Sequence, residues 1–209
     1  MSRVRKVKVT QSVSGLPQKK SRNKAVIFTI VLAGLMIMSV FGIVIFGFSD
    51  AQSSITYNKY TFKRTAGGWS TKIDGATVEF NHPPPSVADL AIDPKITERI
   101  RSSPMLYLVA DPDSQEIINF EGARFQYAQL FPRFFNVYTV NAISKESKLY
   151  KQPIITCANA TERVPVIYFT DGNETTITMN ESCIVFASNA QTTVALKDRL
   201  LFALFKIIP

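Results

Sequence analysis

The chain has 209 residues, enough for one ordinary domain with accessory segments, and a formal net charge of +8. Eight Lys and Arg residues lie in residues 1–24, which contain no acidic residue, so residues 49–209 hold 16 basic and 16 acidic side chains. A nucleic-acid-binding domain needs a basic face that displaces counterions from phosphates. The balanced charge of residues 49–209 therefore argues against DNA or RNA as a partner.

The first 48 residues indicate a membrane anchor. Residues 1–24 are expected to form a disordered cytoplasmic tail, because they have little to bury. Their cations act as a topology signal and can also contact anionic lipid. Residues 25–48 are 24 uncharged, mostly apolar residues. As a helix they span about 36 Å, enough to cross a hydrocarbon core of about 30 Å. The excess of cations before this segment predicts a single-pass protein of the cell membrane, with its C-terminal domain outside.

A cleaved signal peptide is the alternative interpretation of this segment. Ser49 and Ala51 are small residues suited to a cut after Ala51. However, the apolar region of a signal peptide has only about 7–15 residues. We therefore expect a signal anchor, a linker at residues 49–56, and one extracytoplasmic domain at residues 57–209.

The first part of this domain predicts a three-stranded β-meander over residues 57–80. Residues 57–64 alternate, with Tyr60 and Phe62 on one face. Residues 69–73 and 76–80 flank Asp74-Gly75, a strong two-residue hairpin signal. The three prolines after His82 end the meander, because proline cannot donate to a ladder.

The next elements predict a parallel strand pair joined by a helix. Asp93-Pro94 is typical of an N-cap and first turn, which favours a short helix at 94–102. Residues 105–110 form a continuous apolar run, as in a central strand covered on both faces. A helix at about 114–131, ended by Pro132, and a strand at 134–143 should follow. Strand, helix and strand with a short return predict a right-handed crossover.

The remaining sequence predicts strands at 153–157, 164–169, 175–179 and 183–187 and a final helix at about 192–208. This helix is apolar but carries Lys197, Asp198 and Arg199, which favours a core-packing helix over a membrane span. The fold class is therefore predicted as α/β, or α+β, with a βαβ…ββα core at residues 104–209.

This order of elements from residue 104 onward resembles the thioredoxin fold. In that family a proline in the cis form opens the third core strand, and Val164-Pro165 matches that position. The Cys-x-x-Cys of thioredoxin-like enzymes is replaced here by Asp111-Pro-Asp-Ser114, so the resemblance does not imply their redox activity. The layout is also similar to that of single-pass archaeal envelope proteins, on the residues 153–161, 181–185 and 198–201. That second resemblance implies no particular activity.

Few residues suggest catalysis. His82 is the only histidine, and there is no CxxC, HExxH, Walker A, GxGxxG or GxSxG motif, so neither a metal nor a cofactor is expected. Asp111, Asp113 and Glu116 follow a predicted central strand, where open α/β sheets often bind ligands. Ordinary helix capping demands the same residue types, so this group is only a weak candidate ligand site.

Two covalent features are expected outside the cytoplasm. Cys157 and Cys183 are the only cysteines, and a disulfide between them would persist there. One ends a predicted strand and the other begins one, and adjacent strands bring Cα atoms within disulfide range. The alternative is a pair of buried free thiols. Three sequons, at Asn159, Asn173 and Asn180, are possible glycosylation sites.

These features favour a non-catalytic binding or scaffold module of the cell envelope, with an unknown envelope protein as partner. The alternative is a thioredoxin-like redox protein or small envelope enzyme that uses Cys157 or the Asp111/Asp113 group. Whether the chain is an enzyme stays open at the level of sequence.

Overall fold

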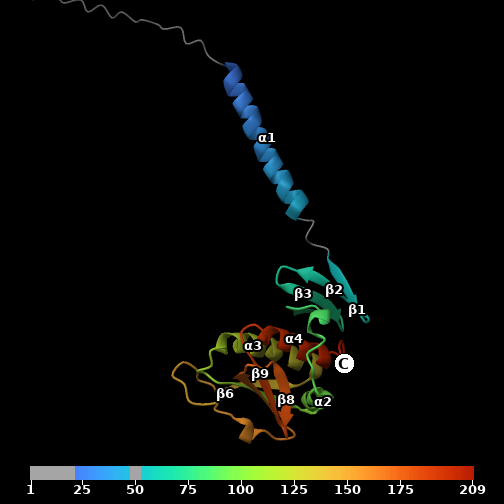
Figure 1. Ribbon diagram of the computed structural model, residues 1–209, viewed down its shortest axis with the longest axis vertical. Helices are drawn as coiled ribbons and strands as arrows, with labels where there is room; N and C mark the ends of the chain where they lie inside the picture. Colours follow the sequence, from blue (N-terminus) through green and yellow to red (C-terminus); the bar gives the residue numbers. More distant parts are fainter. Residues whose placement is uncertain (1–21, 48–52) are drawn as a thin grey trace, which may run out of the picture. The chain divides into compact units, whose positions relative to one another are not determined.

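The computed structural model describes residues 22–47 and 53–209, and the chain divides into two compact units, Met1–Asp50 and Ala51–Pro209 (Figure 1). In the first unit the described element is helix α1, Arg22–Gly47, whose described side chains are all exposed. Predictions made for residues 1–21 and 48–52 lie outside the described residues.

The predicted transmembrane helix requires correction. Within residues 22–47 and 53–209 we find no helix that is both long enough and apolar enough to cross a membrane. The transmembrane helix predicted at residues 25–48, and the single-pass part of the predicted fold class, are therefore wrong. Helix α1 begins at Arg22, so its first turn consists of Arg22, Asn23 and Lys24. The sequence predicts these three residues to be part of a disordered tail, whereas they are helical.

The second unit begins with a four-stranded antiparallel sheet in the order β1-β2-β3-β4. Its strands are β1, Ser54–Tyr57; β2, Tyr60–Thr65; β3, Gly68–Ile73; and β4, Ala76–Phe80. The Asp74-Gly75 hairpin is confirmed, with Ile73 opposite Ala76. The meander has one strand more than predicted, because residues 54–56 of the expected linker pair with β2.

The second sheet has five strands in the order β6-β5-β7-β9-β8. Strand β5 runs parallel to its neighbours β6 and β7, and β9 runs parallel to the central strand β7, whereas β8 pairs with β9 in the antiparallel sense. The strands are β5, Met105–Ala110; β6, Tyr138–Ile143; β7, Val166–Asp171; β8, Thr176–Asn180; and β9, Cys183–Ser188. The predicted parallel pair of β5 and β6 is confirmed.

The two faces of this sheet are covered differently. Helix α3, Ile117–Phe135, connects β5 to β6. The chain then returns across β5 to β7, in the opposite direction along the sheet. A right-handed return in that direction must use the face opposite α3. Accordingly, Val109, Val166 and Cys183 form a separate small core against Ile155 and Ala160 of the return segment, residues 144–165.

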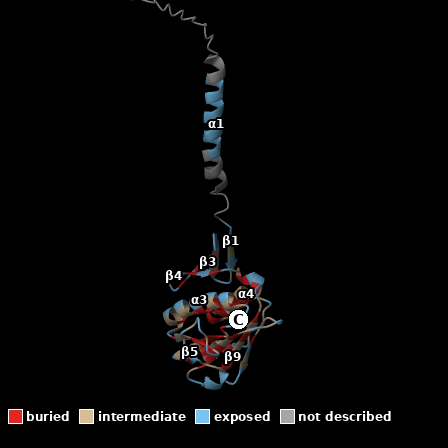
Figure 2. Ribbon diagram, turned by 90° about the vertical axis from the view of Figure 1, so that its left-hand side faces the viewer, coloured by how far each residue is buried: buried red, intermediate tan, exposed pale blue. Residues whose placement is uncertain are grey.

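A layer of helices lies between the two sheets (Figures 1 and 2). Helix α4, Thr193–Leu204, packs against the meander, and the Phe202 and Phe80 ring centroids lie 4.4 Å apart. Helix α3 packs on the other sheet, with Phe120 and Phe169 centroids 5.6 Å apart. The remaining helical segments within residues 53–209 are α2, Pro94–Ser102, and two 3₁₀ turns, Pro84–Val87 and Cys157–Asn159. The Asp93 carboxylate caps α2 as predicted, by accepting from the Lys95 N–H at 2.9 Å.

Helix α3 differs from its prediction at both ends. It begins at Ile117 and continues through Pro132 to Phe135. A proline near a helix end removes one backbone donor, and packing compensates for that loss. The rings of Phe134 and Phe135 contact Phe205, with centroids 5.2 and 5.0 Å apart. Asn136, in the left-handed region at φ 56°, closes the helix.

Two further expectations differ from the structure. Residues 153–157 do not form a strand; they make one bridge, between Ile154 and Ile143, before the 3₁₀ turn at Cys157. The described residues contain no cis peptide bond, so Val164–Pro165 is trans and the cis-proline of the thioredoxin resemblance is missing.

Candidate functional site

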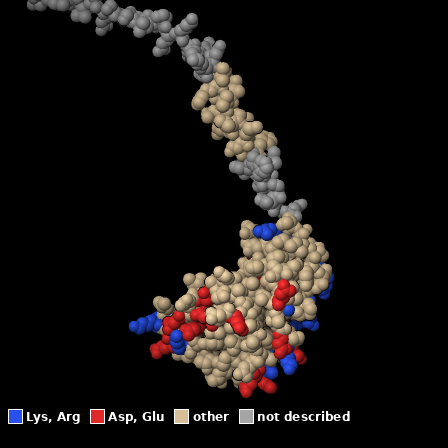
Figure 3. Space-filling view, in the orientation of Figure 1, with Lys and Arg blue, Asp and Glu red and all other residues tan. Residues whose placement is uncertain are grey.

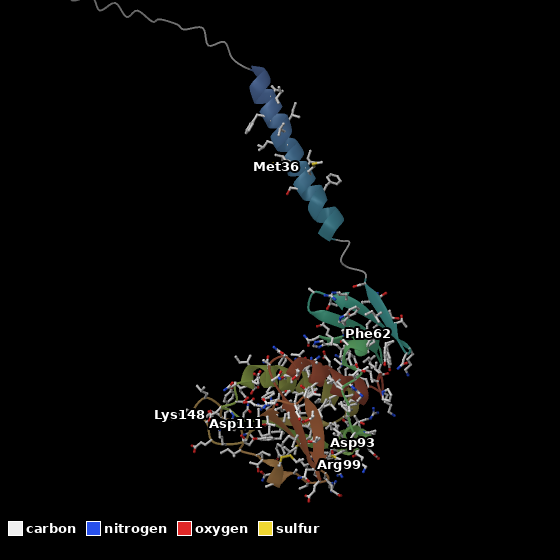
Figure 4. The ribbon with its side chains drawn as sticks, viewed as in Figure 1. Met36, Phe62, Asp93, Arg99, Asp111 and Lys148 are labelled. Atoms are coloured by element: carbon white, nitrogen blue, oxygen red, sulfur yellow. A yellow bond between two sulfur atoms is a disulfide. The ribbon has the colours of Figure 1, made fainter. Side chains whose placement is uncertain are left out.

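Two members of the predicted acidic group, Asp111 and Asp113, follow the carboxyl end of β5 and form ion pairs with one lysine. Lys145, just after β6, places its ammonium 2.9 Å from Asp111 Oδ1 and 3.0 Å from Asp113 Oδ2. Partial burial by itself raises the pKa of Asp111, but the Asp113 backbone N–H and the Lys145 ammonium outweigh it and lower that pKa overall. Hydrogen bonds to Asp111 and Asp113 raise the pKa of Lys145. Figure 3 shows acidic and basic side chains interspersed over this end of the domain, near Asp111 and Lys148 in Figure 4.

The neighbouring polar residues close the turn into α3. The Ser114 hydroxyl donates to Asp171 at the end of β7 and accepts from the Glu116 N–H at 2.9 Å. Glu116 does not join Asp111; its carboxylate accepts from Asn119 at 2.8 Å. The described residues contain no group of three or more His, Cys, Asp or Glu that could hold a metal ion. The group therefore closes a turn, and Asp171 is the partner that the sequence did not reveal.

The two cysteines form a disulfide, with sulfur atoms 1.94 Å apart and Cα atoms 5.2 Å apart (Figure 4). The predicted pairing is confirmed, although Cys157 lies in a 3₁₀ turn and not on a strand. Cys157 is exposed and Cys183 is buried at the start of β9. The bond ties the return segment to the sheet. All three sequon asparagines, at 159, 173 and 180, are exposed.

His82 contacts a buried carboxylate of α4. Its Nδ1 lies 3.1 Å from Asp198 Oδ2, and the same oxygen accepts the backbone N–H groups of Asn81 and His82 at 2.9 and 2.8 Å. The Asp198 side chain is fully buried, whereas 37% of the His82 side chain is exposed. The bonds fix the chain at the end of β4 to the helix layer.

Lys197 completes this buried cluster. Its ammonium lies 2.8 Å from Asp198 Oδ1 and 2.7 Å from Asn81 Oδ1, and also donates to Gln126 Oε1. The Asp198 contact is an ion pair without hydrogen-bond geometry, since Oδ1 has no hydrogen-bonded partner. The Gln126 amide in turn donates to the Glu79 carbonyl at 2.7 Å. The cluster therefore joins β4, α3 and α4. In the sequence, this cluster was indicated by two charged residues, Lys197 and Asp198, inside an otherwise apolar helix.

A surface groove runs along α3 beside this cluster. One hollow of about 230 Å³ and another of about 490 Å³ share Asn81, Gly122 and Gln126. One wall is a single face of α3, at helical spacing: residues 118, 122, 125, 129 and 133. The other wall is formed by residues 77–81 at β4 and by residues 193, 194 and 197 of α4.

Gly122 lies where the two hollows meet. A Cβ atom at this position would meet nothing within 4 Å, so no packing contact in the described chain requires a glycine. Glycine inside a helix costs about 1 kcal/mol relative to alanine. On either side of it, Ile118 and Phe125 are 82% and 65% exposed. Large apolar side chains on both sides of an open position are typical of a docking surface.

The fold defines an α+β domain with one disulfide and a surface groove along α3. Comparisons with known protein families, with curated proteins and with solved structures found no match.

Proposed function

We propose that this protein is a non-catalytic binding module that holds a segment of a partner polypeptide in the groove along α3. The main support for this proposal is the open position at Gly122 between the exposed side chains of Ile118 and Phe125. An apolar side chain of the partner fills the space above Gly122. Burying such a side chain contributes about 1.5–3 kcal/mol.

The polar lining of the groove favours a polypeptide over a charged small molecule. Asn81, Asn119 and Gln129 contribute neutral side-chain amides to the walls. Amides donate and accept as peptide groups do, so they complement an extended backbone. Two cations line the groove. Lys197 is only 4% exposed and is already paired with Asp198, and the Arg133 guanidinium lies 5.4 Å from the Phe134 ring centroid.

The disulfide supports a location in an oxidising compartment outside the cytoplasm, because disulfides persist there and are reduced in the cytosol. We therefore propose an extracytoplasmic envelope protein as the partner. Exposed sequons at Asn159, Asn173 and Asn180 are open to glycosylation in a cell with that machinery.

Site-specific photocrosslinking in intact cells tests this function. A photoreactive phenylalanine analogue replaces Phe125 in the full-length chain, and Tyr138, an aromatic residue that is 68% exposed on β6, serves as the matched control position. We expect a discrete adduct from position 125 and not from position 138. The adduct should disappear when Gly122→Trp fills the groove. Identical adducts from both positions, or an adduct that survives Gly122→Trp, would show that the groove is not the binding site.

A further inference from the structure

The edge strand β4 presents backbone groups to the groove. Asp74 and Gly75 both have positive φ, 49° and 80°, so the hairpin has a type I′ turn and Ile73 and Ala76 form its hydrogen-bonded closing pair. Such pairs alternate along an antiparallel ladder. The backbone groups of Val78 and Phe80 therefore point to β3, and those of Thr77 and Glu79 point outward.

Side chains of the helix layer already form hydrogen bonds with some of the outward backbone groups on this edge. The Glu79 carbonyl accepts from the Gln126 amide at 2.7 Å, which confirms its outward direction. The Asn81 N–H donates to Asp198 at 2.9 Å. The Gln126 amide occupies the position that an N–H of a neighbouring strand would take. In the described residues the Thr77 N–H and C=O and the Glu79 N–H have no such partner.

We propose that the bound segment adds to the meander as a fifth strand beside β4. This proposal rests on the proposed function and specifies how the groove holds its ligand. The backbone of an extended segment pairs with that of Thr77 and Glu79. The Gln126 amide releases the Glu79 carbonyl, which then accepts a hydrogen bond from an N–H of the partner. Strand addition to an exposed edge is a general way of binding peptides, with hydrogen bonds supplying affinity and alternate side chains supplying specificity.

The two faces of the sheet predict the side chains of this segment. Val78 and Phe80 are buried toward the helix layer, so partner residues level with them face Gly122 and Phe125 and must be apolar. Thr77 and Glu79 are exposed on the outer face. Glu79 makes no ion pair in the described part of the chain, and opposite charges on adjacent strands attract, so the partner residue level with Glu79 is basic. Thr77 lies opposite Lys72 of β3, so charge favours a basic partner residue at Glu79 alone. The partner segment therefore alternates apolar residues on the inner face with polar residues on the outer face, and the outer residue level with Glu79 is basic.

The other edge of the same sheet supplies a matched control. Tyr57 pairs with Tyr60 across the two-residue β1–β2 hairpin, so Thr56 and Thr61 form a non-hydrogen-bonded pair. The Thr56 N–H consequently points outward from β1, as the Thr77 N–H does from β4. Thr77→Pro and Thr56→Pro each remove one outward donor without removing a ladder bond.

The test measures binding of a fluorescent Lys-Val-Lys-Val-Lys-Val peptide to the full-length protein by anisotropy. One backbone hydrogen bond at about 1 kcal/mol corresponds to roughly a fivefold change in Kd, and two correspond to roughly a thirtyfold change. We expect Thr77→Pro, which removes one donor, to weaken binding about fivefold and Thr56→Pro to leave it unchanged. A peptide N-methylated on alternate residues, on the edge that faces β4, loses two donors and should bind wild-type protein about thirtyfold more weakly. A Glu-Val counterpart should also bind more weakly.

The outcomes separate the two proposals. Binding that Gly122→Trp abolishes, but that neither Thr77→Pro nor N-methylation weakens, refutes the fifth strand and leaves the groove as the binding site. Binding that is insensitive to Gly122→Trp refutes the groove itself. Failure of the basic peptide to bind, or equal binding of the acidic one, refutes the predicted side-chain pattern. Because N-methylation changes only the peptide, it tests the fifth strand even if the Thr77→Pro variant does not fold.

Discussion

Loss of the disulfide should lower the free energy of unfolding of the second unit by an amount set by the length of the loop that the bond closes. Cys157 and Cys183 are separated by 26 residues. In the chain-entropy description, closing a loop of that size lowers the entropy of the unfolded chain enough to stabilise the fold by about 3.5 kcal/mol. At 2–4 °C per kcal/mol, roughly as expected for this size, reduction or the double substitution of both cysteines by alanine should lower Tm by about 7–14 °C.

The assay is thermal unfolding followed by circular dichroism with and without reductant, with the double alanine variant as the control that reductant should not affect. Hydrogen exchange should rise first in the return segment, residues 144–165, because the bond ties it to β9. Exchange at β4 should change least. Two freely alkylated cysteines in untreated protein, or a Tm that reductant does not move, would refute this reasoning.

Three further predictions concern stability. Gly122→Ala should stabilise by about 0.5–1 kcal/mol in urea unfolding, because its Cβ is unobstructed; Gly68→Ala, where φ is +144° and Cβ collides with the Phe80 carbonyl, should destabilise instead. Lys197→Met should cost about 3–5 kcal/mol by leaving the buried Asp198 carboxylate without its cation; a loss below about 1 kcal/mol would contradict the ion pair. Burial, and then the negative charge of Asp198, raise the pKa of Tyr127 well above 10. The neutral phenol therefore contributes its full share to the free energy of unfolding below about pH 10, and this contribution declines as pH rises toward the folded-state pKa. Tyr127→Phe should therefore flatten stability against pH above about 10, and an unchanged alkaline profile would contradict this.

Local signals in the sequence were sufficient wherever the physical cause is local. The Asp74-Gly75 turn, the Asp93 cap of α2 and the apolar strand β5 depend on neighbouring residues alone, and all three are confirmed. The pairing of the two cysteines was also predictable from their number. The sequence located Asp111 and Asp113 at a strand end but did not reveal their ion pairs with Lys145, since that residue follows the next strand, β6, about 30 residues further along the chain.

Local rules failed where distant packing outweighed them. Pro132 was expected to end a helix, but the contacts of Phe134 and Phe135 with Phe205 carry α3 past it. The predicted span at residues 25–48 was the largest error, because the described residues contain no helix that meets its requirements.

The sequence by itself determined the turns, the α2 cap and most of the strands of the second unit, since these are properties of short segments. The tertiary structure decided which surfaces face each other. Helix α4 is enclosed between two sheets, so Lys197 and Asp198 must pair in the interior. The groove exists only because the edge of β4 and one face of α3 meet across about 45 residues of chain, a proximity that no local pattern encodes.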